Sequence, residues 1–471
     1  MQAVRRVIDR INQETLRQVY RGTGSKAYRP ELMLAIALYM ILQGLRSPAR
    51  WAENAKTKDQ CKLLGRGIEP SRTVFYDFRD RAAKFIESVH DEIIALAITN
   101  QVIEPTDGCL DGTFVAASAS RHKMFNLKQI SRRLGILKRA ISKLDNPHQV
   151  SSNQPLAKCP GWLATTSSGR REQLERFRRA KARILQEIRD NRNLPKSLRR
   201  DEARMALSPA DIDAVIGKDK FKVTRPLYNI QYMCDFRSDV ILSYGVYRKK
   251  NDTGTLLPMI EKTQSVTGGL LKRVHADSGY CSLLELEDSQ QAGVELFAPV
   301  AIKKGSKGRP TESGLPQIPA DEFAWNSSAN LLSCPVGHSM RQVSRSRDPR
   351  ADNRYVIELR FEQSEQRCGE CELAGQCLAS GSKRRTIRRL EKQSLLDAQG
   401  LKMDSDEGRA SGRQRRIQVE RRYGDSKQHR GGSHLHGRGL TRTTGETGLM
   451  VVAQNCLTLY NLEKHTANDS N

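Results

Sequence analysis

Two short segments of the sequence place an aspartate where a β-strand could present it to a bound ion. Asp111 lies in CLDGTFVAASAS, whose β-branched and small residues are typical of a buried strand. Gly112 follows it and allows a ligand to approach the backbone closely. Asp277 lies in HADSGY, at the carboxyl end of another predicted strand, and open α/β sheets bind ligands beyond that end. Because carboxylate oxygens are preferred ligands of Mg²⁺, both aspartates are candidates for a metal site.

A third acidic residue, Glu420, stands among cations in RRIQVERRYGDSKQHR. At helical spacing, a glutamate and an arginine usually form a surface ion pair worth about 0.2–0.5 kcal/mol. The density of positive charge around this single acid favours a different role, a metal ligand on a helix that handles phosphate. The surrounding cations are predicted to hold DNA, and they are Arg413, Arg415, Arg416, Arg421, Arg422, Lys427 and Arg430.

Two other aspartates compete for these roles, and their local sequence argues against both. Asp107 belongs to PTDG, which is typical of a turn. Asp252 follows Asn251 and is predicted to cap a helix that begins near Thr253. Aspartate is also common as a plain turn residue at the end of a strand, so this structural role remains an alternative for the two candidates.

Four of the ten cysteines form a separate group in CPVGH and CGECELAGQC. Cys368 and Cys371 have C-x2-C spacing, Cys377 follows six residues later, and Cys334 lies upstream, which suits tetrahedral Zn²⁺. His338 is a fifth candidate for the four places. The closed ligand set predicts a structural zinc, with reduced thiols that bind no metal as the alternative. The other six cysteines are scattered and resemble small hydrophobic residues: Cys61, Cys109, Cys159, Cys234, Cys281 and Cys456.

The first 100 residues are predicted to form a helical, DNA-binding domain. PELMLAIALYMILQGL, at 30–45, is nearly apolar all round and predicts a helix buried in a small bundle. Two later helices, PARWAENAK and RTVFYDFRDRAAKF, are joined by a turn and could form a helix-turn-helix in which Arg72 and Arg79 contact DNA. A plain helical bundle or a dimerisation domain is the alternative.

Residues 121–210 are predicted to be a basic helical insertion after the first strand. Apolar residues repeat in steps of three and four in two stretches, which predicts a helical hairpin joined by a loop at 146–170. Between 121 and 200 there are 21 lysines and arginines against 5 aspartates and glutamates, a net charge of +16. A solvated helix face would mix the two signs, so contact with the DNA backbone is favoured.

The remaining segments predict an α/β protein with a mixed sheet. From 226 to 299 the order is a strand hairpin, a helix, a strand, a helix and a strand. Lysine-, glycine- and proline-rich sequence with the cysteine group then interrupts this regularity, and helices resume at 409–424 and 445–463. The predicted organisation is a helical domain at 1–100, the first part of the core at 105–300, a zinc-binding insertion at 301–405 and C-terminal core helices at 406–464.

The overall charge predicts a polyanionic partner. Lysine and arginine number 79 against 53 aspartates and glutamates, which gives +26, and such an excess repels itself unless a polyanion binds. No apolar run approaches the roughly 20 residues of a membrane-spanning helix. The N-terminal MQAVRRVIDRINQETLRQ lacks the apolar core of a signal peptide. We therefore expect a cytoplasmic protein associated with the nucleoid and no membrane partner.

Three segments, LDGTFVAA, HADSGY and RRIQVERRYGDSK, resemble in this order the catalytic motifs of DDE transposases from bacterial insertion sequences. The third resembles that family's signature of Tyr, Arg, Glu and Lys separated by two, three and six residues. Arg416, Glu420 and Lys427 match it, whereas Arg413 stands at the tyrosine position and removes an aromatic surface. RSPARW, SRTVFYDFR and RPLYNIQYMCDF also resemble segments of these enzymes. The cysteine group resembles the zinc-ribbon-like insertion of one branch, and the similarity runs from about 28 to 462.

The resemblance implies an RNase H-like core, a five-stranded mixed sheet with Asp111 on its first strand and Asp277 on its fourth. Glu420 is then on a late helix, after a large insertion. The three carboxylates are implied to hold two Mg²⁺ ions, or Mn²⁺ in their place, about 4 Å apart. Arg416 and Lys427 are implied to anchor phosphates. The implied partners are double-stranded DNA, as transposon ends and target, and a second copy of the chain on paired ends.

Three other functions remain alternatives to a transposase. A basic DNA-binding regulator without chemistry would keep all its activity after Asp111→Ala. An RNase H-like nuclease or resolvase would cut DNA without joining it, and a strand-transfer assay with pre-cleaved ends would separate it from a transposase. A degenerate transposase copy is disfavoured because the three motifs are intact.

Overall fold

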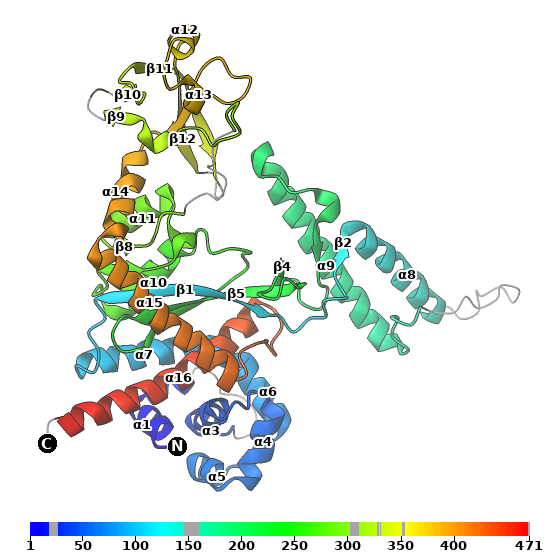
Figure 1. The fold of residues 1–471 in the computed structure, drawn as a ribbon. Helices are drawn as coiled ribbons and strands as arrows, with labels where there is room; N and C mark the ends of the chain where they lie inside the picture. Colours follow the sequence, from blue (N-terminus) through cyan, green and yellow to red (C-terminus); the bar gives the residue numbers. More distant parts are fainter. Residues whose placement is uncertain are drawn as a thin grey trace, which may run out of the picture.

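A mixed sheet of six strands forms the centre of the computed structural model, which describes residues 1–17, 27–145, 160–301, 310–326, 329, 331–350 and 354–469 (Figure 1). Four strands are joined in the order β5-β1-β7-β8, and β4 and β6 share the free edge of β5. Strand β1 is antiparallel to β5 and parallel to β7. The bounds are β1 Asp107–Ala116, β4 Val215–Lys218, β5 Thr224–Asp235, β6 Ile241–Tyr247, β7 Arg273–His275 and β8 Glu295–Phe297.

This order and these directions are consistent with an RNase H-like core. The antiparallel strands β1, β5 and β6 are followed by β7 and β8, which run parallel to β1. The expectation of five strands is corrected by β4, a sixth. Strand β5 has 12 residues and β6 only 7, so β6 leaves the N-terminal half of β5 unpaired. Strand β4 pairs with that half and covers its free backbone groups.

Helices cover both faces of the sheet because successive side chains of a strand point to opposite faces. Leu110 of β1 lies in a core with α10 (Leu256–Thr267) and α11 (Leu283–Gln291). Its neighbour Cys109 lies in a second core on the other face, with Val419 and Tyr423 of α15 (Asp406–Gly424). Asp111 shares this second face with Cys109, so its side chain points toward α15.

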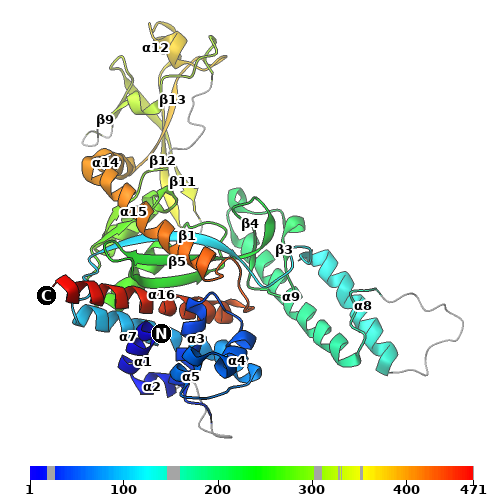
Figure 2. The same cartoon turned by 60° about the horizontal axis from the view of Figure 1, so that its bottom comes forward.

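The N-terminal helices and the C-terminal helix form one body beneath the sheet (Figures 1 and 2). The helix predicted at 30–45 is confirmed as α3, of which every residue except Tyr39 is buried. The core of the bundle also includes Val240 and Leu242 beside and within β6, so the bundle is continuous with the sheet. The bounds are α1 Gln2–Arg10, α2 Gln13–Arg17, α3 Pro30–Leu42, α4 Pro48–Thr57, α5 Asp59–Gly65, α6 Arg72–Arg81, α7 Ile86–Thr99 and α16 Leu440–Asp469.

A helical hairpin projects sideways from the sheet (Figure 1). It consists of α8 (Leu127–Asp145) and α9 (Ser167–Asn193), and two short strands, β2 (Phe125–Asn126) and β3 (Ala206–Leu207), pair at its base. The predicted apolar seams meet in a core that includes Ile130, Leu134, Leu137, Phe177, Ile184 and Ile188. Most of the loop predicted at 146–170, including Cys159, lies outside the described residues.

A second sheet stands at the opposite end of the molecule from the N-terminal helices (Figure 2). It is antiparallel, in the order β13-β12-β11-β10-β9, with its own small core around Phe323, Leu332 and Phe361. Helix α14 (Gln393–Asp404) then returns to the central sheet, where Gln399 donates to the carbonyls of Leu296 and Ala298. The bounds are β9 Ala324–Asn326, β10 Leu331–Ser333, β11 Ser339–Pro349, β12 Tyr355–Glu362, α12 Glu365–Gly369, α13 Ala374–Cys377 and β13 Thr386–Leu390.

Within the described ranges, no helix combines the length and apolar character needed to cross a membrane.

A buried ion pair fixes the loop that leads from α15 to α16. Arg46 and Glu446 lie 2.6 Å apart, and their side chains are 4% and 6% exposed. Arg46 also donates to the carbonyls of Gly431 and His434, and Glu446 accepts the backbone N–H of His436. The pair therefore connects the N-terminal bundle to the segment that follows the third predicted motif.

We expect Glu446→Ala to lower the free energy of unfolding by about 3–5 kcal/mol, because it leaves the Arg46 guanidinium buried without its counter-charge. The matched control is Glu53→Ala, which breaks the exposed Arg50–Glu53 pair and is expected to cost less than about 1 kcal/mol. Urea unfolding followed by circular dichroism measures both. Equal losses in the two variants would contradict the structural role of the buried pair.

Candidate active site

Asp111 lies in the middle of β1, between the sheet and α15. Its Oδ1 accepts the backbone N–H of Gly112 at 2.8 Å, and its Oδ2 lies 3.4 Å from the guanidinium of Arg415. Burial raises the pKa of Asp111 to about 6, against the opposing effect of Arg415. The carboxylates of Asp277 and Asp252 raise it further, which places both acids near Asp111.

Asp277 follows β7 by two residues, where β7 separates from β1. The last paired residues of the two parallel strands are Cys109 and His275, so the chain positions of Asp111 and Asp277 are level with each other. Asp277 caps a short 3₁₀-helix, Ser278–Tyr280, and its Oδ1 accepts the N–H of Gly279 at 2.7 Å. The two aspartates thus meet at the carboxyl end of β7, where an α/β sheet binds ligands.

Asp252 does not cap a helix, so that prediction is wrong. Helix α10 begins at Leu256 with Thr255 as its N-cap residue, because a turn containing Gly254, at φ +70°, separates the helix from Asp252. The carboxylate of Asp252 instead accepts the side-chain amides of Asn229 at 2.9 Å and Gln231 at 2.7 Å.

Asp107 does not lie in the turn that its local sequence predicts, and its contacts are structural. It is the first residue of β1 and is buried, with Arg273 at 2.5 Å and His275 at 3.3 Å from its Oδ1. Burial alone would raise its pKa, but hydrogen bonds from Arg273 and Thr106 bring the pKa below its ordinary value. Asp107 is therefore paired within the protein.

Polar contacts at both ends hold α15 against the sheet. Near the C-terminal end, the Tyr423 hydroxyl donates to the carbonyls of Asp111 at 2.7 Å and Ile230 at 3.1 Å. Toward the N-terminal end, the Ser411 hydroxyl lies 2.6 Å from Nδ1 of His275, the residue that precedes Ala276 and Asp277. These contacts align α15 with both aspartate-bearing segments.

Glu420 lies on α15 between these contacts, but its side chain is exposed. Arg415, Val419 and Tyr423 occupy the face of α15 that meets the sheet, and Glu420 is turned about 100° from Val419. Arg415, and not Glu420, therefore contacts Asp111. Among the residues that the structure describes, no three His, Cys, Asp or Glu side chains are arranged to hold a metal ion as they stand.

Lys427 lies beside Asp111, in a π-helical turn (Asp425–His429) directly after α15. Its ammonium group donates to the hydroxyl of Thr113, which is two residues beyond Asp111 on the same face of β1. Burial lowers the pKa of Lys427, and the charge of Asp111 opposes that effect. Lys427 thus brings a positive charge to the site.

The other predicted DNA contacts differ in exposure. Arg413 and Arg416 on α15 and Arg72 at the start of α6 are exposed. The prediction that Arg79 contacts DNA is corrected, because its side chain is only 10% exposed. The Arg79 guanidinium lies 2.7 Å from the carboxylate of Asp80, which also binds Arg442 of α16 at 3.2 Å. Arg79 therefore joins α6 to the C-terminal helix.

The cysteine group surrounds one small cavity of about 30 Å³ in the second sheet domain. Its lining includes all four predicted zinc ligands, Cys334, Cys368, Cys371 and Cys377, together with His338. Burial raises the pKa of Cys377, and the other three thiols raise it further. Among the described residues, however, no three of these side chains are placed to hold a metal ion as they stand. All four thiols are free, and they are the donor type that Zn²⁺ accepts.

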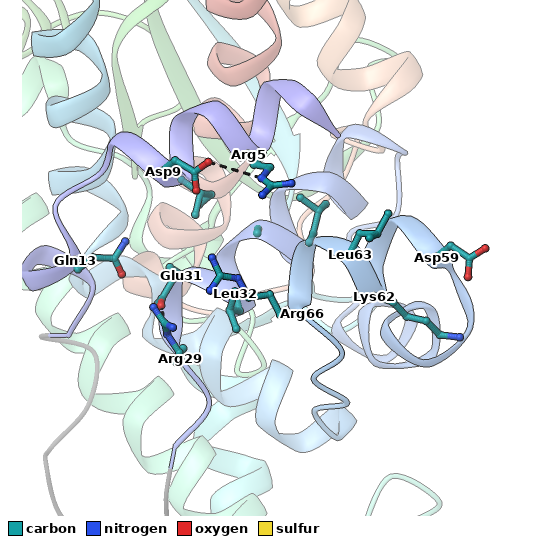
Figure 3. Close-up of a pocket in the computed structure, with 13 residues that line it drawn as sticks. Arg5, Asp9, Gln13, Arg29, Glu31, Leu32, Asp59, Lys62, Leu63 and Arg66 are labelled. Carbon is teal, nitrogen blue, oxygen red and sulfur yellow. Dashed lines mark hydrogen bonds and ion pairs between the residues drawn. The ribbon is translucent and has the colours of Figure 1, made fainter.

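A larger cavity, of about 720 Å³, lies among the N-terminal helices (Figure 3). Its charged side chains include both signs, and two pairs bind each other: Arg5 with Asp9 at 3.8 Å, and Arg29 with Glu31. None of the residues that line it belongs to β1, β7 or α15. We assign this cavity no part in the chemistry of the carboxylates.

Two family models match the ends of this chain. Residues 333–460 match the family described as Transposase DDE domain, and residues 1–81 match Transposase domain (DUF772). Together the two matches support a DDE transposase of an insertion sequence. The DDE-domain match includes the cysteine group, α15 with Glu420, and Lys427, whereas Asp111 and Asp277 precede it. A search of curated proteins finds no match to the chain.

Sequence reasoning rejected Asp252 as a helix cap, gave Arg415 only as one of the cations around Glu420, and did not name Tyr423. For Asp252 a signal exists, because Asn229 and Gln231 interrupt the otherwise apolar run from Leu227 to Cys234, and buried amides need polar partners. Tyr423 and Arg415 lie inside the third motif, but only the docked position of α15 distinguishes them from its exposed side chains.

Proposed function

We propose that this DDE transposase cleaves DNA at the ends of an insertion sequence and transfers the strands to target DNA with divalent metal ions. The observation that supports this most is the meeting of Asp111 and Asp277 at the carboxyl end of β7, with α15 docked over Asp111. Carboxylates from separate elements leave room for substrate and water between them, as phosphoryl-transfer chemistry requires.

Asp111, Asp277 and Glu420 are the proposed ligands of two Mg²⁺ ions, which Mn²⁺ can replace. The two aspartates fit a divalent cation because their oxygens are hard donors. Glu420 offers the same donor type, but it is exposed on α15 and must turn toward the sheet to join them. Asp111 is also close to two like charges that a cation would offset, and Arg415 now supplies part of that compensation. When bound, such ions activate a water or a DNA 3′-hydroxyl and stabilise the leaving oxygen.

Double-stranded DNA is the proposed substrate, bound mainly through its phosphates. Exposed Arg413 and Arg416 flank Glu420 on α15, and Lys427 brings a cation to β1. The basic hairpin and Arg72 extend the positive surface toward flanking DNA, and phosphate contacts of this kind supply affinity without reading sequence. We propose a homodimer on paired ends and association with the nucleoid as the working state.

The second sheet domain is proposed to bind one structural Zn²⁺ through Cys334, Cys368, Cys371 and Cys377, with His338 as the alternative ligand. That all four cysteines line one cavity supports this role. The apolar core of this domain is small. Burial of apolar side chains therefore stabilises the domain only in part, and a bound Zn²⁺ would add to its folding free energy.

We expect Asp111→Asn and Glu420→Gln each to lower Mg²⁺-dependent cleavage of element-end DNA by at least about a hundredfold, because loss of a metal ligand removes several kcal/mol of transition-state stabilisation. Binding of the same DNA in EDTA should persist. The matched control is Glu261→Gln, an exposed glutamate of α10, which should leave cleavage unchanged.

Equal cleavage by Glu420→Gln and the wild-type chain would refute Glu420 as the third ligand. Pre-cleaved ends test the second step separately. A chain that cuts but does not join them is a nuclease of RNase H-like type, and a chain that binds without cutting is a regulator.

The zinc proposal predicts one zinc per chain by mass spectrometry of the purified protein. Cys371→Ser should lose that zinc and lower the melting temperature, since a structural zinc contributes to folding free energy. Cys281→Ser, which changes a cysteine packed beneath the central sheet, is the control and should keep it. Full zinc content in Cys371→Ser would contradict the assignment.

A further inference from the structure

Asp252 lies between Asp111 and Asp277, and two glycines show how close it is to each. A methyl group on Gly112, the residue after Asp111, would overlap Oδ1 of Asp252. A methyl group on Gly279 would lie 2.9 Å from Oδ1 of Asp277 and 4.0 Å from Oδ2 of Asp252. The carboxylate of Asp252 therefore extends from the backbone beside Asp111 to the turn that carries Asp277.

Buried amides orient this carboxylate. Asn229 and Gln231, both fully buried on β5, donate to its Oδ1 at 2.9 and 2.7 Å. Gln231 also donates to Oδ1 of Asn229 at 2.8 Å, and the hydroxyl of Tyr280 donates to Oε1 of Gln231. Both donors act on one oxygen, and Oδ2 accepts no hydrogen bond from any residue that the structure describes.

The loop that contains Asn251 and Asp252 does not need the carboxylate of Asp252 to stay in place. The backbone already holds it there, because Asn229 donates to the carbonyl of Asn251 at 3.1 Å and the Thr255 hydroxyl donates to the carbonyl of Asp252 at 2.6 Å. Two amides inside a strand cost free energy unless they bind a polar group. Asn229 and Gln231 hold the carboxylate of Asp252 beside those of Asp111 and Asp277, an arrangement that like-charge repulsion disfavours.

We propose that Asp252 is a fourth carboxylate of the metal site, with Oδ2 facing a divalent cation or its bound water. This rests on the proposed function and extends it. Asn229 and Gln231 are then positioning residues, which act through Asp252. The carboxylate of Asp111 is engaged by Gly112 and Arg415, so a cation must compete with Arg415 for it, and Asp252 adds a donor oxygen to that competition.

The test measures Mn²⁺ binding to the full-length chain without DNA, from the electron paramagnetic resonance signal of free Mn²⁺. Asp252→Asn should weaken binding by at least about tenfold, because the amide keeps an oxygen for Asn229 and Gln231 but loses the charge. Asp235→Asn is the matched control, since Asp235 also accepts two N–H groups, from Arg237 and Ser238. This control variant should bind Mn²⁺ with the same affinity as the wild type.

Asp252→Glu restores a carboxylate and should recover most of the affinity, and thermal unfolding of each variant monitors the fold. Wild-type binding together with unchanged binding in Asp252→Asn would overturn the role of Asp252 and leave the proposed function standing. A wild-type chain that binds no Mn²⁺ would overturn the metal site itself, and Asp252 with it.

Discussion

The docking of α15 on β1 is the contact on which the candidate active site depends. Tyr423 donates to the backbone carbonyl of Asp111 across 312 positions of sequence, and Arg415 reaches the carboxylate of the same residue. The entire second sheet domain lies between these segments in the chain, so the connection itself cannot place the helix. Hydrogen bonds to β1, β5 and β7 place it, and the Arg46–Glu446 pair holds the segment that follows. Without this docking, the third motif would be separated from the first two.

The site balances like charges against cations. Asp111, Asp252 and Asp277 stand together, and Arg415 and Lys427 approach from the side of α15. Burial is the largest cause of both pKa shifts at the site, the raised pKa of Asp111 and the lowered pKa of Lys427. The site is therefore partly shielded from water. Charges interact more strongly in such a place than in bulk solvent. A bound cation would offset the charges of the three aspartates, and a DNA phosphate would offset those of Arg415 and Lys427.

Local patterns allowed much of the fold to be predicted, whereas tertiary contacts decided the rest. Alternating or apolar runs mark β1, β5, β6 and α3, and cysteine spacing marks the group that converges on one cavity. Arg72 and Arg79 are seven residues apart on one helix and so share a face, yet only Arg79 is buried, where the neighbouring Asp80 binds Arg442 of α16. Likewise, the sequence around Asp252 resembles a helix cap, and only the amides of β5 reveal its position beside Asp111. No local pattern could have shown that Glu420 is exposed while Arg415 faces the sheet.

The central claim, one metal site formed by three distant segments, is tested most directly by iron-mediated cleavage of the protein chain. Fe²⁺ is substituted for Mg²⁺ in the presence of ascorbate and peroxide, and the backbone cuts are mapped by mass spectrometry. We predict cuts next to Asp111, Asp277 and Glu420, all suppressed by excess Mg²⁺. Cuts confined to other segments, or cuts at these three that excess Mg²⁺ does not suppress, would contradict a shared site.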